Sequence, residues 1–265
     1  MYPYGTVNIT VPEADTAQMH QCGGSAPFWF GYTKLPSYAD SNGFILIYPG
    51  TTRDDKCWDI NNSSSLTHGK GGDALGIVNM VQYTLTTYNA DASKVYAMGA
   101  SSGAMMTNVL AGSYPDVFEA GAAFSGVAFA CGLGDDSPTP VSKNQTCVQG
   151  LEHTPEQWAA FVYNAYPGYS GRRTRMMIVH GLADPIVRPQ AGREALKQWS
   201  TVLNVPLTRN ISGVPSKIYT QQIYGDGTQL QGFFGRGVKH WAPVNEPLIL
   251  NFFGILANNS TAFSS

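Results

Sequence analysis

The stretch KVYAMGASSG, residues 94–103, decides the fold of this chain. Its first half is typical of a β-strand, and residues 104–110 after it favour a helix. A Gly-x-Ser-x-Gly motif between a strand and a helix makes a turn so sharp that only small residues fit beside the serine, whose hydroxyl projects above the sheet. Glycine and serine also occur in ordinary turns, so it is the strand and helix on either side that make Ser101 a candidate nucleophile.

A serine hydroxyl becomes a good nucleophile when a histidine takes its proton and a carboxylate holds that histidine in place. In the α/β-hydrolase fold these partners follow in the chain order Ser, Asp or Glu, His. Asp184 follows the apolar run 176–179, where catalytic groups of open parallel sheets lie. His240 is the one histidine after Asp184, in the glycine-rich segment 235–243. The order predicts a triad of Ser101, Asp184 and His240.

Each partner also has a simpler interpretation. Asp184 precedes a proline and fits a plain turn, and His240 beside Trp241 fits a packed surface histidine. His180 is the main competitor as base, but it stands so close to Asp184 that we expect it to order the acid loop instead. Asp226 is a rival acid, although its glycine neighbours are typical of a hairpin turn.

Composition agrees with one enzyme domain over residues 1–265. The chain is 43% hydrophobic and 13% charged, which permits a large core. A net charge of -2 without clusters of Lys and Arg argues against nucleic-acid binding. No apolar run reaches the roughly 18 to 20 residues of a membrane span. Alternating strand and helix signals predict an α/β-hydrolase fold, with a mostly parallel central sheet and helices on both faces.

Several elements can be placed individually. We expect Asp73 to cap a helix and Asn245 to cap the last one, which should bury Leu248, Ile249, Phe252, Phe253 and Leu256. Strands are predicted at 6–11 as an edge strand, at 44–48 as a buried one and at 120–125, an extended segment at 217–224, and a helix at 190–203.

Cysteines and asparagines bear on the compartment. None of the four cysteines lies in a Cys-x-x-Cys pair, so two disulfides are plausible, with free core thiols as the alternative. Seven Asn-x-Ser/Thr sequons together favour a secreted glycoprotein. Residues 1–4 lack the basic start and apolar segment of a secretory leader, so we infer export and expect a mature form or an incomplete gene model. The sequons are at Asn8, Asn61, Asn62, Asn144, Asn210, Asn258 and Asn259.

Many segments resemble one family. They include HQCGGSA at 20–26, LPSYAD at 35–40, CWD at 57–59, GGDALGI at 71–77, GASSGAMMTN at 99–108, TPEQW at 154–158 and AYPGY at 165–169. Together with the regions around Asp184 and His240, they are similar to fungal acetylxylan esterases and their feruloyl-esterase relatives over nearly the whole chain. The resemblance implies an extracellular serine esterase that acts on plant-cell-wall xylan with Ser101, Asp184 and His240.

The resemblance also implies an oxyanion hole made of two backbone amides, those of Cys22 and Ser102. The elbow geometry independently requires the second, since Ser102 follows the nucleophile. By the same analogy Cys22 pairs with Cys57 and Cys131 with Cys147. We expect no metal or organic cofactor, a monomer, and neither a membrane nor a nucleic-acid partner.

Two departures from the family pattern stand out. Where relatives have an apolar strand, residues 13–19 read EADTAQM, so a central strand is expected to be curtailed and the loop carrying Cys22 loosened. Lys143 replaces a tryptophan that is expected to line the acyl pocket, so Lys143 is a candidate substrate contact. Trp58, Trp158 and Trp241 are candidates to stack on sugar rings, with core packing the simpler interpretation for two of them.

The function predicted is removal of O-acetyl groups from xylan by an acyl-enzyme mechanism. The nearest alternative is a feruloyl esterase with the same chemistry and a larger acyl group. An alternative of another class is a non-catalytic carbohydrate-binding protein whose oxyanion loop no longer works.

Overall fold

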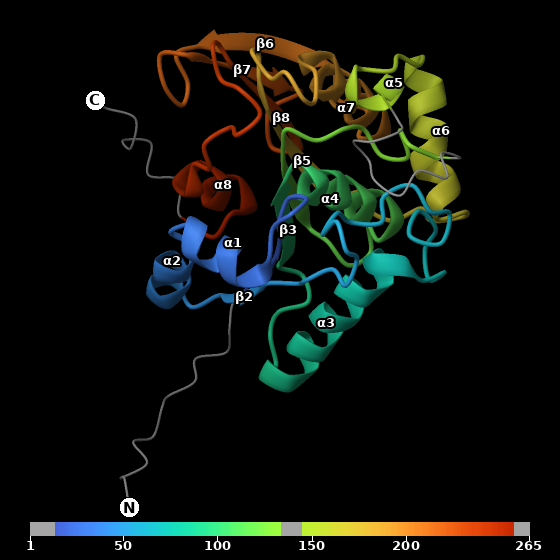
Figure 1. Ribbon diagram of the computed structural model, residues 1–265, viewed down its shortest axis with the longest axis vertical. Helices are drawn as coiled ribbons and strands as arrows, with labels where there is room; N and C mark the ends of the chain where they lie inside the picture. Colours follow the sequence, from blue (N-terminus) through green and yellow to red (C-terminus); the bar gives the residue numbers. More distant parts are fainter. Residues whose placement is uncertain (1–13, 134–144, 257–265) are drawn as a thin grey trace, which may run out of the picture.

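One eight-stranded sheet organises the computed structural model, which describes residues 14–133 and 145–256 (Figure 1). The strand order is β2-β1-β3-β4-β5-β8-β7-β6; the first six strands pair in parallel, and β7 and β6 join antiparallel at one end. The strands are β1 (Asp15–Met19), β2 (Ile45–Ile47), β3 (Val95–Ala100), β4 (Ala120–Phe124), β5 (Arg175–Gly181), β6 (Leu207–Ser212), β7 (Tyr219–Tyr224) and β8 (Leu230–Gly235).

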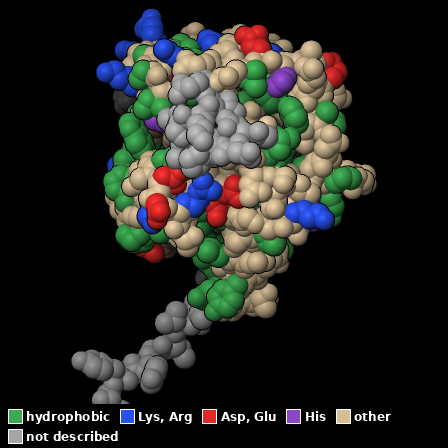
Figure 2. Space-filling model, turned by 45° about the vertical axis from the view of Figure 1, so that its right-hand side comes forward, with side chains coloured by type: hydrophobic (Ala, Val, Ile, Leu, Met, Phe, Trp, Pro, Cys, Tyr) green, Lys and Arg blue, Asp and Glu red, His purple; other side chains and the backbone are tan. Residues whose placement is uncertain are grey.

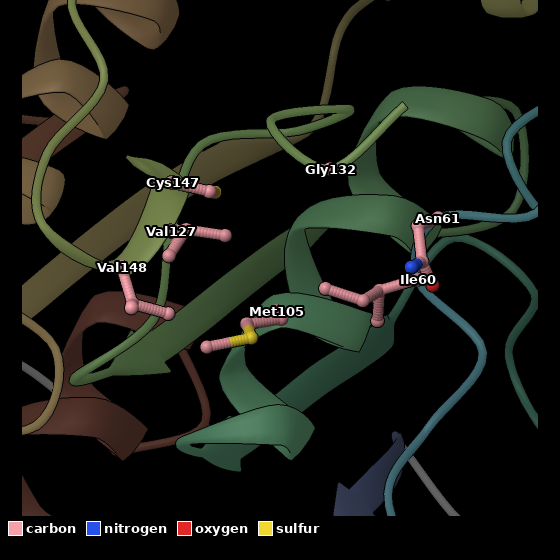
Figure 3. Close-up of a pocket in the computed structure, with 7 residues that line it drawn as sticks. All are labelled: Ile60, Asn61, Met105, Val127, Gly132, Cys147 and Val148. Carbon is pink, nitrogen blue, oxygen red and sulfur yellow. The ribbon is translucent and has the colours of Figure 1, made fainter. Parts of the chain in front are cut away.

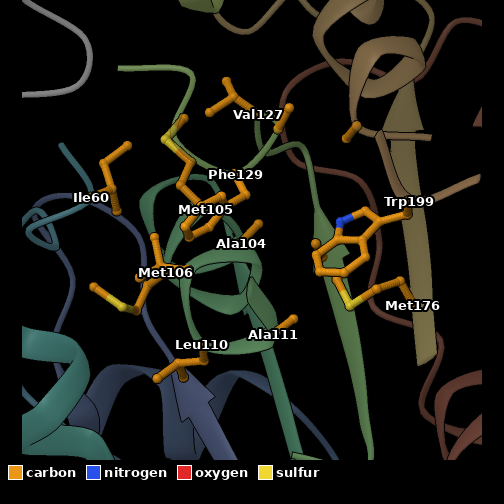
Figure 4. Packing of buried hydrophobic residues seen from close by; sticks show 14 of the residues in the cluster. Ile60, Ala104, Met105, Met106, Leu110, Ala111, Val127, Phe129, Met176 and Trp199 are labelled. Atoms are coloured by element: carbon orange, nitrogen blue, oxygen red, sulfur yellow. The ribbon is translucent and has the colours of Figure 1, made fainter. Parts of the chain in front are cut away.

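Helices cover both faces of this sheet and enclose two apolar cores. The larger core lies under α3, α4, α6 and α7, where Met105, Met106 and Leu110 of α4 pack near Phe129 and Trp199 (Figure 4). The other lies under α1, α2 and α8. This arrangement confirms the predicted α/β-hydrolase fold. The helices are α1 (Ala26–Tyr32), α2 (Leu35–Asn42), α3 (Gly72–Tyr88), α4 (Ser102–Ser113), α5 (Gln145–Val148), α6 (Pro155–Ala165), α7 (Pro189–Val202) and α8 (Glu246–Phe253).

Most predicted elements are confirmed, with local corrections. Asn245 caps α8 by accepting the Leu248 amide, and β4, β7 and α7 lie where the sequence placed them. Asp73 is not a cap: α3 starts after Gly71, and the Asp73 carboxylate accepts the backbone N–H of Asp59 instead. The strand predicted as buried at 44–48 is β2, only half-buried because it pairs with β1 alone. The predicted strand 6–11 lies outside the described residues.

In the last helix, the apolar face is close to that predicted. Ile249, Phe252 and Phe253 are buried, while Leu248 and Leu256 are half-buried against the same core. No helix among the described residues has the length and apolar character needed to cross a membrane.

The expectation of a curtailed central strand was wrong. All five residues of β1 are buried, and the strand pairs over its full length with β3 and over three residues with β2. Backbone hydrogen bonds form whatever the side chains are, which is why a polar sequence still completes the sheet. The consequence is polar groups in both cores, because Asp15 shares a face with Val95 and Gln18 shares the other with Met98.

The carboxyl group of Asp15 is one of these buried groups and the one that can ionise. Its side chain is fully buried, and neither oxygen has a hydrogen-bond partner among the described residues. Burial disfavours the charged form and raises the pKa of Asp15 to about 6. The folded chain therefore holds this proton more tightly than the unfolded chain. The resulting destabilisation is absent below pH ~4, grows as the pH rises to about 6, and then levels off near 3 kcal/mol.

Replacement of this buried acid should stabilise the protein in a pH-dependent way. We expect Asp15→Val to raise the free energy of unfolding, by about 2 kcal/mol more at pH 7 than at pH 4, because only the ionised carboxylate carries the full burial cost. Urea unfolding at the two pH values measures it. Asp40→Asn, at an exposed acid, is the matched control. An equal gain at both pH values, or a loss, would contradict the burial argument.

Candidate active site

Ser101 lies at the sharp turn between β3 and α4. Its backbone has φ of 55°, a left-handed conformation that serine rarely adopts, and its amide donates to the Phe124 carbonyl at 2.9 Å. A Cβ atom on Gly103 would overlap the carbonyl oxygen of Met19, and one on Gly99 would overlap the backbone of Gly103. Both glycines are therefore required by backbone contact, as the motif predicted.

The structure brings together the three side chains of the predicted triad. Nε2 of His240 lies 2.9 Å from Oγ of Ser101, and Nδ1 lies 2.8 Å from Oδ2 of Asp184. An ionised carboxylate can only accept, so Nδ1 carries the proton and Nε2 is left to accept the serine O–H. All three side chains are nearly buried, and Ser101 and His240 keep 7% and 8% of their surfaces exposed. This is the protonation pattern that a general base needs.

Two adjacent loops hold the acid and the base. The loop after β5 donates the Leu182 amide to the Gly235 carbonyl at 2.8 Å and the Ala183 amide to the Val238 carbonyl at 2.9 Å. Because β5 and β8 are parallel neighbours, their carboxyl ends place both loops at the same edge of the sheet. The imidazole of His240 is thus fixed relative to the carboxylate by backbone contacts as well as by its own hydrogen bond.

Four donors surround the Asp184 carboxylate. Burial would raise its pKa, but hydrogen bonds from His180, from His240 and from the Ile186 amide outweigh it and hold the pKa of Asp184 well below its usual range. The Val187 amide is the fourth donor, 3.0 Å from Oδ1. The group is therefore ionised at neutral pH, and the stability that its hydrogen bonds contribute is present above the unfolded pKa and is lost only in strong acid.

His180 and Asp226, the competing candidates for base and acid, lie next to the acid loop and in a hairpin turn, as expected. His180 is fully buried; its Nε2 lies 2.9 Å from the Val187 carbonyl and 3.5 Å from Oδ2 of Asp184. A carbonyl only accepts, so Nε2 carries a proton that is shared toward the carboxylate, which orders the acid loop. Asp226 lies in the turn between β7 and β8, where its carboxylate accepts two hydrogen bonds from Thr228.

The two amides expected in the oxyanion hole are unpaired. Ser102 is the first residue of α4, and neither its N–H nor that of Cys22 has an acceptor in the part of the chain that the structure describes. Cys22 is bonded to Cys57, and Cys131 to Cys147, the pairing that the resemblance implied. The first disulfide joins the loop after β1 to the loop that contacts the elbow.

Trp58 connects the loop after β1 to the start of α4 and does not face a ligand. It is only 2% exposed; its backbone N–H donates to Oγ of Ser102 at 2.8 Å, and its indole N–H donates to the His20 carbonyl at 2.7 Å. Trp158 is fully buried and donates to a carboxylate oxygen of Glu194. The prediction that these two tryptophans stack on sugar rings was therefore wrong. Both are packed in the core, the simpler interpretation, and their indole N–H groups donate to internal acceptors.

Trp241 differs from these two. It is 49% exposed, and its ring centroid lies 6.0 Å from that of His240, edge to face. It remains a candidate sugar contact. Lys143 lies outside the described residues.

Two cavities have apolar walls. A narrow one of about 10 Å³, room for about one water molecule, lies beside α4, where Met105, one turn after Ser101, faces Ile60, Val127 and Val148 (Figure 3). A larger one of about 200 Å³ lies on the α8 face and includes no triad residue. Sequence reasoning found neither, because their linings come from separate segments with no shared motif.

Side chains of both charges are distributed over the face shown in Figure 2. Within residues 14–133 and 145–256, no group of three or more His, Cys, Asp or Glu side chains is arranged to hold a metal ion.

The fold and the elbow define the class of protein: an α/β hydrolase. Comparison with known proteins narrows it. Residues 7–204 match the family described as Esterase PHB depolymerase, and the chain belongs to this family of carboxylic ester hydrolases.

Named relatives are similar to this chain over most of the length of both proteins. The chain is 60% identical over 256 residues to Feruloyl esterase B of Neurospora crassa, covering 97% of this chain and 88% of the relative. It is 38% identical over 258 residues to Acetylxylan esterase A of Aspergillus ficuum, covering 96% and 84%. Among solved structures, the acetyl xylan esterase from Aspergillus awamori is 36% identical and covers 94% of this chain and 92% of its own, with a TM-score of 0.89.

A change at His180 should alter catalysis through Asp184. We expect His180→Ala to lower kcat by about 10-fold with little change in KM, because the carboxylate loses one donor that orients it. The acid limb of the pH profile should move to higher pH, since a carboxylate with fewer donors holds the protonated imidazole more tightly. His180→Gln, which keeps a side-chain N–H, should restore much of both. An unchanged pH profile together with a lowered melting temperature would mean that His180 only packs.

Proposed function

We propose that this protein is a secreted serine esterase that removes ester-linked acyl groups from xylan. Ser101 is the nucleophile, His240 the general base and Asp184 the residue that orients the base. The observation that supports this most is the pair of hydrogen bonds, 2.8 and 2.9 Å, that joins the three side chains in the tautomer needed for proton transfer. The names of the relatives support xylan as the polymer.

The reaction follows from that geometry in two halves. Nε2 of His240 takes the Ser101 proton as Oγ bonds to the ester carbonyl carbon, and the ionised Asp184 carboxylate stabilises the imidazolium that forms. The C–O bond to the sugar then breaks, and the leaving oxygen receives the proton from Nε2. A water molecule repeats the sequence on the acyl-enzyme and releases the carboxylic acid.

Negative charge develops on the carbonyl oxygen in both halves. We assign the N–H groups of Cys22 and Ser102 to bind it, because neither has an acceptor among the described residues. Ser102 directly follows the nucleophile, and the Cys22 loop begins where Met19 and His20 contact Gly103. Fixed donors of this kind typically contribute ~3 kcal/mol each to the transition state. The Cys22–Cys57 disulfide and the hydrogen bond from the Trp58 amide to Oγ of Ser102 connect the segments that carry the two amides.

For the acyl group, we propose feruloyl first. The support is the higher identity to a feruloyl esterase, 60%, than to an acetylxylan esterase, 38%. Acetyl, the group predicted from the sequence, is the second candidate. It is favoured by the backbone similarity to an acetyl xylan esterase and by the narrow cavity beside Met105, which is much smaller than an aromatic ring.

We also propose that the protein works outside the cell as a glycosylated monomer. Two disulfides, which persist in oxidising compartments, support export. Among the described sequons, Asn62 and Asn210 are exposed and open to modification.

Loss of the nucleophile should abolish turnover without unfolding the protein. We expect Ser101→Ala to reduce kcat at least ~1,000-fold, because no other described group replaces the acylated oxygen. An organophosphonate should label the wild type at Ser101, located by peptide mapping. Ser37→Ala, at an exposed serine, is the control for activity and melting temperature. A wild type that retains xylan, cleaves no ester and resists labelling would support the carbohydrate-binding alternative instead.

A side-by-side assay should separate the two acyl groups. We expect a higher kcat/KM for methyl ferulate than for a small aryl acetate, because relatives of higher identity are feruloyl esterases. A tenfold difference corresponds to about 1.4 kcal/mol of transition-state binding. Better turnover of the acetate would overturn the feruloyl proposal and restore the acetyl one.

A further inference from the structure

The proposed mechanism divides the site into an acyl side and an alcohol side. His240 must give its proton to the leaving oxygen, so the sugar that leaves has to lie next to Nε2. The acyl group lies away from it, toward the oxyanion amides. Residues that surround His240 on the surface are therefore placed to contact the sugar. This inference rests on the proposed function.

Three large apolar side chains are exposed around the acid and base loops. Trp241 is 49% exposed, Ile186 43% and Leu182 41%, whereas Asp184 and Val187 of the acid loop are buried. We call Leu182, Ile186 and Trp241 the apolar rim. Exposed apolar side chains on the two loops that carry a proposed catalytic acid and base are candidates to contact a ligand.

Short chains of hydrogen bonds fix this rim to the triad. The Ile186 amide donates to Oδ1 of Asp184 at 2.9 Å, and Oδ2 of the same carboxylate accepts Nδ1 of His240, the residue before Trp241. The Leu182 amide is tied to the Gly235 carbonyl. The rim is therefore held close to the base, and a ligand resting on it would be held close to the serine.

The chemistry of the rim matches a sugar ring. Pentose rings present apolar C–H faces that stack on indole, and aliphatic side chains cover the same faces, while the hydroxyls stay in water. Lys239, two residues before Trp241, is exposed and brings no negative charge against the ligand.

We propose that the apolar rim is the binding site for the sugar residue that carries the ester, so that Trp241 and Ile186 determine selectivity for the alcohol and not for the acid. A simple methyl ester has no group to reach the rim. Substitutions in the rim should then lower kcat/KM for sugar esters and have little effect on kcat/KM for methyl esters of the same acid.

The test compares kcat/KM for a feruloylated pentose oligosaccharide with that for methyl ferulate. Trp241→Ala and Ile186→Ala should lower the value for the sugar ester by about 3-fold to 10-fold and leave the methyl ester within about 2-fold, as loss of one stacking contact predicts. Trp241→Phe, which keeps an aromatic face, should retain most of the wild-type preference. Tyr83→Ala is the matched control, because Tyr83 is 68% exposed on α3 and outside the rim.

The outcomes separate this proposal from the one it rests on. Equal losses on both esters would overturn it, since the rim would then act only by positioning His240; no loss on either would also overturn it. A Trp241→Ala variant that turns a dimer into a monomer would show that a second copy covers the rim instead. If the wild type prefers acetate, acetylated oligosaccharide against methyl acetate replaces the pair. A wild type that cleaves none of these esters would refute the proposed function itself.

Discussion

The close approach of β1 to the elbow is the constraint on which the rest of the structure depends. Gly103 leaves no room between its Cα and the carbonyls of Met19 and His20, so the carboxyl end of β1 touches the first turn of α4. The chain runs on from this contact through Gln21 to Cys22, so the contact fixes where the loop that carries Cys22 begins relative to α4. A side chain at Gly103 would push β1 away from α4 and displace that loop. Trp58 then closes the region by bonding to both sides of the contact.

Parallel strand pairing positions the other part of the site, which consists of Asp184 and His240. The registers of β3 with β4, β4 with β5 and β5 with β8 bring their carboxyl ends to one edge, so loops from distant parts of the chain meet there. Asp184 and His240 are 56 residues apart, and Ser101 and His240 are 139 apart, yet each pair is in hydrogen-bond contact. The distances are short because the sheet sets them, and the loops contribute only the last few backbone bonds.

This explains what could be predicted from the sequence. Ser101, Asp184 and His240 could be predicted because each lies in a recognisable local pattern and the three follow the chain order that the fold requires. Trp58 and Trp158 could not be told from Trp241, since burial is decided by acceptors such as the His20 carbonyl and Glu194, which belong to other segments. The cap of α3 and the exposure of Ile186 and Leu182 were missed for the same reason. Each depends on packing between segments and not on neighbouring residues.

The polar strand β1 shows how far backbone bonding can outweigh side-chain chemistry. Relatives are expected to have apolar residues here, and Asp15 and Gln18 are buried without hydrogen-bond partners among the described residues. The strand persists because it is paired on both edges, by β2 and β3, and because its small residue Ala17 and its apolar Met19 still fill the core near the elbow. The polar cost therefore falls on the stability of the sheet. The Cys22 amide, which we propose for the oxyanion hole, lies beyond the end of the strand, where the Gly103 contact and the Cys22–Cys57 disulfide constrain the loop without the side chains at 15 and 18.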